Sequence, residues 1–94
     1  NSSNLINEDK LSNVLDLVES NQKEISNLAY DLNNKLQAIE DIKNSLEDPK
    51  LIKSNDTHIK VENLNIEISK LKNTIIDLEN SIKVLKDKNL SYKE

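Results

Sequence analysis

The sequence of 94 residues lacks several residue types altogether: it contains no Gly, Cys, Met, Trp or Phe, and all thirteen of its basic residues are Lys. Gly supplies the positive φ angles of tight hairpins and phosphate-binding loops, and strands favour aromatic residues. These absences therefore argue against β structure and against Gly-rich cofactor loops. Without Cys the chain can form neither disulfide bonds nor thiolate metal sites. Its 32% charged and 35% apolar residues are typical of long exposed helices.

The net charge and the short apolar runs exclude two further kinds of partner. Seventeen acidic residues outnumber the thirteen lysines and are spread along the chain. Nucleic-acid-binding proteins present a basic face that is usually rich in Arg, so we expect no nucleic-acid partner. No apolar stretch approaches the roughly 20 residues that cross a bilayer, so we also expect no direct membrane insertion.

Apolar residues recur in steps of three and four from Leu11 onwards, which is the spacing of one face of a helix. In heptad notation, the a positions are Leu11, Val18, Ile25, Leu32, Ile39 and Leu46, and the d positions are Val14, Asn21, Leu28, Lys35 and Ile42. Further apolar residues stand beside these columns, at e (Leu15, Ala29, Leu36) and at g (Leu17, Ala38). So broad an apolar face is typical of a helix with two or more neighbours.

A second and stricter heptad repeat begins at Val61. Its a positions are Val61, Ile68, Ile75 and Ile82, and its d positions are Leu64, Leu71, Leu78 and Leu85. β-Branched residues at a with Leu at d favour a narrow seam with a single, parallel partner. The opposite face carries Ile52, Ile59 and Ile66, followed less regularly by Ile76 and Val84. If these residues are buried as well, a further chain lies alongside.

The segment between the two repeats contains the single Pro of the chain, Pro49. Pro inside a helix costs about 3 kcal/mol, which argues against one straight rod through this residue. We predict a helix over residues 5–47, a connection over 48–56 with a short helical turn at 49–54, and a helix over 57–92. Asp48 is the candidate N-cap of the turn, and residues 54–57 offer four candidates for the last helix.

Two all-α arrangements of these helices compete, a helical hairpin and an extended parallel pair of chains. The parallel pair gains a single clear attraction between flanking charges, Glu67 with Lys72 of the mate, because most other e and g residues of the second helix are Asn, Thr, Ser or Lys. The similar helix lengths and the break at Pro49 support the hairpin. We therefore favour a hairpin, with the heptad packing of a coiled coil, whose burial is completed by oligomerisation or by a partner chain. Because the sequence contains no Met, we expect residues 1–94 to be a single coiled-coil segment of a larger protein.

The apolar heptad columns are the predicted functional residues, because burial of an a/d seam is how helices recognise one another. We predict a protein interface made of Leu11, Val18, Ile25, Leu28, Leu32, Ile39, Ile42, Leu46, Val61, Leu64, Ile68, Leu71, Ile75, Leu78, Ile82 and Leu85. The partner is a protein that packs helix against helix, in a homo- or hetero-oligomer.

Three polar residues also invite a functional interpretation. Asn21 and Lys35 interrupt the d column, and we interpret them as residues that trade stability for a defined register. His58 is the single His and has no Cys nearby, so we interpret it as an exposed residue rather than a metal ligand. No nucleophile–base pair, cofactor loop or ligand cluster is present in the sequence, so we expect no enzymatic activity, small-molecule substrate, cofactor or metal.

The first hypothesis for function is a non-catalytic scaffold or oligomerisation segment of an intracellular complex, cytoplasmic or nuclear, of the cytoskeletal, spindle, nuclear-pore or vesicle-tethering type. The alternative is the helical stalk of an extracellular surface protein or adhesin of a microbe with an A/T-rich genome, since Asn, Lys and Ile are abundant. Sequons begin at Asn1, Asn55 and Asn89, close to the number expected by chance. A third possibility, a helical module of the membrane-fusion or trafficking machinery, requires a flanking membrane anchor.

Overall fold

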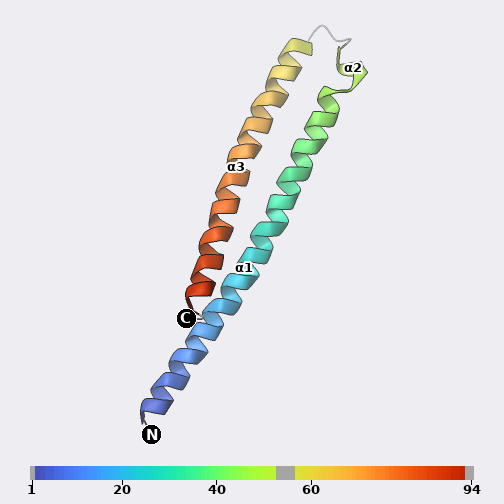
Figure 1. The fold of residues 1–94 in the computed structure, drawn as a ribbon. Helices are drawn as coiled ribbons and strands as arrows, with labels where there is room; N and C mark the ends of the chain where they lie inside the picture. Colours follow the sequence, from blue (N-terminus) through green and yellow to red (C-terminus); the bar gives the residue numbers. More distant parts are fainter. Residues whose placement is uncertain (1, 53–56, 93–94) are drawn as a thin grey trace.

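The structure is a computed structural model that describes the backbone of residues 2–52 and 57–92 and the side chains of residues 8–50 and 57–92. It consists of α1 (Ser2–Leu46), α2 (Pro49–Ile52) and α3 (Thr57–Tyr92). The two long helices lie side by side and run in opposite directions, with α2 at the turn between them (Figure 1). No strand occurs in the described ranges. The predicted all-α class is confirmed, and of the two predicted arrangements the structure has the hairpin.

The hairpin is long and thin. It measures 80 × 15 × 15 Å and has a radius of gyration of 22.0 Å, whereas a compact chain of this length has a radius of about 12 Å. A single straight helix of the same length is about 140 Å long. The molecule is therefore elongated, and the length of 80 Å reflects one fold-back of the chain.

The chain turns because Pro49 and Asp48 end one helix and start the next. Pro49 has no N–H to donate to the preceding turn. The amide of Asp48 closes the end of α1 on the carbonyl oxygen of Ser45, at 3.2 Å. The Asp48 carboxylate then accepts a hydrogen bond from the amide of Lys50 at 2.9 Å. Asp48 therefore caps α2, as predicted.

The helix bounds differ from the predicted ones by a few residues. α1 begins at Ser2 instead of residue 5 and ends at Leu46 instead of residue 47, and α2 covers 49–52 of the predicted turn at 49–54. α3 has the predicted bounds of 57–92. Three of the four candidate N-caps of this helix, at 54–56, lie outside the described residues. The early start of α1 runs through Ser and Asn, which are weak helix formers, so propensity alone did not predict it.

The heptad residues of the two long helices face each other. The buried apolar side chains are Ile25, Ile39 and Ile42 of α1 and Ile68 and Ile75 of α3, at 7–9% exposure. The other a and d residues between 14 and 46 and between 61 and 85 are half-buried, and most intervening residues are exposed. Burial therefore follows the 3–4 spacing, and the seam between the helices is formed by the predicted a and d columns.

The antiparallel register can be read from the hydrogen bond between Asn21 and Asn89, two residues whose numbers add up to 110. Residues on opposite helices lie at the same level wherever their numbers add up to about this value. Ile25 then lies opposite Leu85, and Ile42 opposite Ile68, so that each a position meets a d position. Among the described residues the one ion pair lies within α1, between Asp31 and Lys35. The apolar seam is thus the main contact between the helices.

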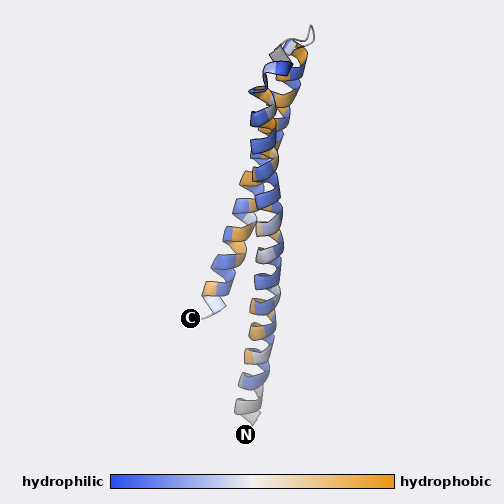
Figure 2. Cartoon of the chain, turned by 90° about the vertical axis from the view of Figure 1, so that its right-hand side faces the viewer, coloured by the Kyte–Doolittle hydropathy of each residue, from blue (hydrophilic) through white to orange (hydrophobic). Residues whose placement is uncertain are grey.

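The two long helices differ in length, with 45 residues in α1 and 36 in α3. Figures 1 and 2 show the N-terminal part of α1 extending past the end of α3. In this register Tyr92, the last residue of α3, reaches the level of Val18. Leu11 and Leu15 lie beyond that level and are 59% and 58% exposed. The first turns of α1 therefore continue the heptad pattern without a facing helix.

We predict that Ile68→Ala lowers the free energy of unfolding by about 2–5 kcal/mol, because it removes a seam side chain that is 9% exposed. Ile66→Ala, two residues away and 47% exposed, is the matched control and changes stability by less than about 1 kcal/mol. Urea unfolding followed by circular dichroism measures both values. Equal effects of the two substitutions would contradict the assigned seam.

Candidate protein-interaction surface

The sixteen residues predicted as a protein interface lie mostly inside the hairpin itself. All of them except Leu11 are buried or half-buried in the seam between α1 and α3. Leu11 lies beyond the end of α3 and is exposed. Their role in contact with another protein stays a prediction. Because the seam residues are already packed against one another, a candidate surface for a partner has to be sought beside the seam.

The most polar layer of the seam lies around Asn89, at the end of the hairpin opposite α2, which we call the open end. This residue is 7% exposed and is the buried polar residue of the described part of the chain. The Asn21 Nδ2 donates to Asn89 Oδ1 at 3.0 Å, and Asn89 Nδ2 donates to Gln22 Oε1 at 3.3 Å and to the Val18 carbonyl oxygen at 3.4 Å. A buried amide must keep such partners, so this layer favours one register over its neighbours.

Lys35, the second polar residue of the d column, behaves differently. In the register of the hairpin it lies at the level of Ile75 and is half-buried. Its Nζ donates to Asp31 Oδ1 at 3.1 Å, one turn earlier on the same helix. The aliphatic part of the side chain can thus cover the seam while the ammonium group stays at the surface. Lys35 makes no described hydrogen bond to α3, so the two helices are not locked together at this level.

A long groove runs between α1 and α3 on one side of the seam. It consists of three adjoining hollows. The largest, about 550 Å³, shares Glu79 with one neighbouring hollow and Lys86 and Leu90 with the other. The wall on α1 carries Gln22, Ile25, Ala29, Leu32, Leu36, Ile39 and Lys43, and the wall on α3 carries Lys72, Ile75, Ile76, Glu79, Ile82, Lys83, Lys86, Asp87, Asn89 and Leu90. We call this feature the long groove.

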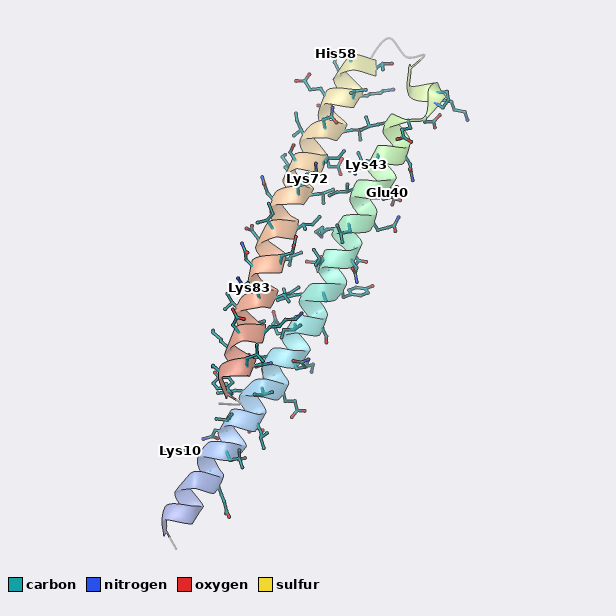
Figure 3. The ribbon with its side chains drawn as sticks, viewed as in Figure 1. Lys10, Glu40, Lys43, His58, Lys72 and Lys83 are labelled. Atoms are coloured by element: carbon teal, nitrogen blue, oxygen red, sulfur yellow. The ribbon has the colours of Figure 1, made fainter. Side chains whose placement is uncertain are left out.

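The long groove follows from the heptad spacing. Gln22, Ala29, Leu36 and Lys43 are seven residues apart at the e positions of α1, and Lys72, Glu79 and Lys86 are the e positions of α3. In an antiparallel pair the e positions of both helices border the same side of the seam. Two of the α1 residues are apolar and Ala29 is small, so this side is apolar and hollowed. Figure 3 shows Glu40 and Lys43 on α1 and Lys72 and Lys83 on α3 along the length of the hairpin.

The opposite side of the seam has a shorter hollow, lined by Glu24, Leu28, Asn80, Ser81, Val84 and Leu85. The apolar residues predicted on the outer face of α3 therefore do not form one stripe. Ile76 lines the long groove, Val84 lines the opposite hollow, and Ile66 lines a separate hollow near the start of α3, whereas Ile59 lines none of these hollows. All four are exposed, at 47–58%, because a hairpin covers only one face of each helix.

Other functional features are not found in the described residues. His58 is exposed near the start of α3, as expected. Within residues 2–52 and 57–92 no group of three or more His, Cys, Asp or Glu side chains could hold a metal ion. No helix described here is long and apolar enough to cross a bilayer.

Comparison with models of protein families, with curated proteins and with solved structures finds no match to this chain.

The sequence prediction missed two features of this candidate surface, although the sequence contains a signal for each of them. Asn89 stands seven residues after Ile82 and continues the a column of α3 as a polar residue, just as Asn21 interrupts the d column of α1. Their pairing requires the antiparallel register, which the a and d columns alone do not provide. The e positions of α3 are all charged or polar, so they were not recognised as one wall of an apolar groove.

We predict that Asn89→Leu lowers the free energy of unfolding by about 1–3 kcal/mol, because the amide of Asn21 loses its acceptor next to an apolar side chain. The double variant Asn21→Leu/Asn89→Leu regains this stability, since it leaves no unpaired amide in the layer. Urea unfolding measures the free energy of unfolding of both variants. A double variant that is less stable than Asn89→Leu contradicts the prediction.

The same double variant is predicted to lose its unique register. Spin labels at Asn27 and Asn63, both exposed, give a single distance in the native chain. In the double variant we expect further distances, shifted by about 10 Å, the rise of one heptad. An unchanged single distance would show that the connection between the helices, and not the Asn layer, sets the register.

Proposed function

We propose that this chain is a non-catalytic assembly module, an antiparallel coiled-coil hairpin that binds another protein through the long groove. The observation that carries the proposal is the large exposed surface of the hairpin. A compact monomer of this mass exposes about 5,500 Å², whereas the hairpin exposes 7426 Å². The elongated hairpin thus keeps about a third more surface exposed than a compact chain of the same mass.

The interior of the hairpin supports the same proposal. Five apolar side chains are buried, and none of the described side chains is less than 2% exposed. At the same time eleven large apolar side chains are exposed, at 37–71%. Single exposed apolar residues are ordinary, but contiguous apolar surface is typical of binding sites. Leu36 and Ile76, at 49% and 54% exposure, lie in the long groove together with the exposed flanks of the seam residues.

The kind of binding proposed is helix packing rather than recognition of a small ligand. The long groove is open along its length and has apolar walls with charged edges, which suits the apolar face of another helix. A scaffold or oligomerisation segment of a larger complex, as expected from the sequence, uses this surface. The groove contains no described side-chain cluster for metal binding, and its charged groups lie at its edges.

A second candidate, the stalk of a surface protein, is favoured by the length of 80 Å, since a stiff rod can hold its turn at a distance from the end where both chain ends lie (Figure 1). In this function the apolar groove is incidental. The two candidates differ in what a groove substitution does: it impairs an assembly module but leaves a spacer unaffected.

We predict that the double variant Leu36→Lys/Ile76→Lys keeps the helical content of the native chain but loses its binding partners. Both side chains are about half exposed, so the substitutions do not unfold the hairpin, and two charges in the groove oppose helix docking. The test is quantitative capture on the immobilised chain from an extract of the source cells. Leu17→Lys/Val84→Lys, with similar exposure outside the long groove, is the control. Identical capture by all three chains contradicts the proposal.

A further inference from the structure

Two apolar residues of the long groove lie at the same level on opposite walls. Leu36 belongs to α1 and Ile76 to α3, and their numbers add up to 112, close to the value of 110 set by Asn21 and Asn89. A twofold axis parallel to the hairpin, above the groove, places Leu36 of one chain over Ile76 of a second copy. The same contact then forms twice. The groove is therefore complementary to itself in its apolar part.

The α1 edge of the groove is acidic, whereas the α3 edge carries a row of lysines among acids. Beside the α1 wall stand Glu19, Glu40 and Glu47 with one basic residue, Lys43, and along the α3 wall stand Lys72, Lys83 and Lys86 with Glu62, Glu79 and Asp87. None of these ten residues forms an ion pair within the described part of the chain, where the recorded pair is Asp31–Lys35. The edges thus remain available to charges of a second molecule.

The charges distinguish two ways of placing one hairpin on another. With the twofold axis along the hairpins, α1 of each copy lies over α3 of the other, and the acidic α1 edge meets the lysines of the α3 edge. Glu40 and Lys72 have numbers that add up to 112, so each Glu40 comes level with Lys72 of the other copy. With the axis across the hairpins, α1 lies over α1 and the glutamates face one another, which is unfavourable.

The surface available is sufficient for this arrangement. The hairpin exposes 7426 Å², about 1,900 Å² more than a compact monomer of its mass. A standard stable interface covers about 800 Å² on each partner. We propose that the partner in the long groove is a second copy of this chain, and that two parallel hairpins related by a lengthwise twofold axis form a four-helix bundle. The inference rests on the proposed function, because it names the partner of the same groove.

The mass of the assembly is the first test. Sedimentation equilibrium of the purified chain, from nanomolar to millimolar concentration, should show a reversible dimer of twice 10.7 kDa. Leu36→Lys/Ile76→Lys should sediment as a folded monomer, and the control Leu17→Lys/Val84→Lys should remain a dimer. A monomer at all concentrations, or an assembly of three or more chains, overturns the proposal.

The charge pattern and the orientation are tested separately. Glu40→Lys or Lys72→Glu should weaken the dimer about tenfold, since each change affects two symmetric contacts, and the combined swap should restore it. A single spin label at Ser20, near the open end, and one at Asn63, near the turn, should each give a short distance between copies. Hairpins that run in opposite directions about the middle of the groove separate the labels at both sites by about 40 Å along the axis. Such long distances at Ser20 and Asn63 overturn the parallel arrangement.

The outcomes also separate this inference from the proposed function. A chain that stays monomeric but captures a different protein through Leu36 and Ile76 refutes the second copy and leaves the assembly module standing. If the groove substitutions change neither sedimentation nor capture, both proposals are wrong.

Discussion

The apolar seam between α1 and α3 is the interaction on which the rest of the structure depends. Apart from the hydrogen bonds of Asn89 to residues of α1, the described contacts between the long helices are apolar. Isolated helices are marginal in water, and most of their stability in proteins comes from packing an apolar face. Pairing of the heptad columns along most of α3 therefore accounts for the long helices, for their antiparallel direction and for the length of 80 Å.

A seam between only two helices has an unavoidable consequence. Each helix can cover one stripe of its partner, so even the best buried side chains, such as Ile39, keep 7% exposure, and the residues at e stay open to water. Where these residues are apolar or small, as at Ala29 and Leu36, a groove results. The feature that makes the hairpin incomplete as a core is also the one on which the proposed assembly function rests.

The sequence predicted the parts of the fold that depend on local periodicity. The facing a and d columns, the break at Pro49 and the bounds of α3 were predicted correctly because each depends on neighbouring residues or on seven-residue spacing. The partnership of Asn21 with Asn89, 68 residues away, was not predicted, because it depends on the register between two helices. Ile76 was assigned to the outer face for the same reason: its place in the groove is defined only relative to α1. The interface role of the seam residues stays a prediction.

The seam folds the chain back on itself instead of joining two extended chains. Small-angle X-ray scattering in dilute solution measures this most directly. The hairpin predicts a radius of gyration near 22.0 Å, and two parallel hairpins side by side change this value little because their length is unchanged. An extended rod of 94 residues, alone or paired, has a radius of gyration of about 40 Å. A measured radius near that larger value would contradict the account.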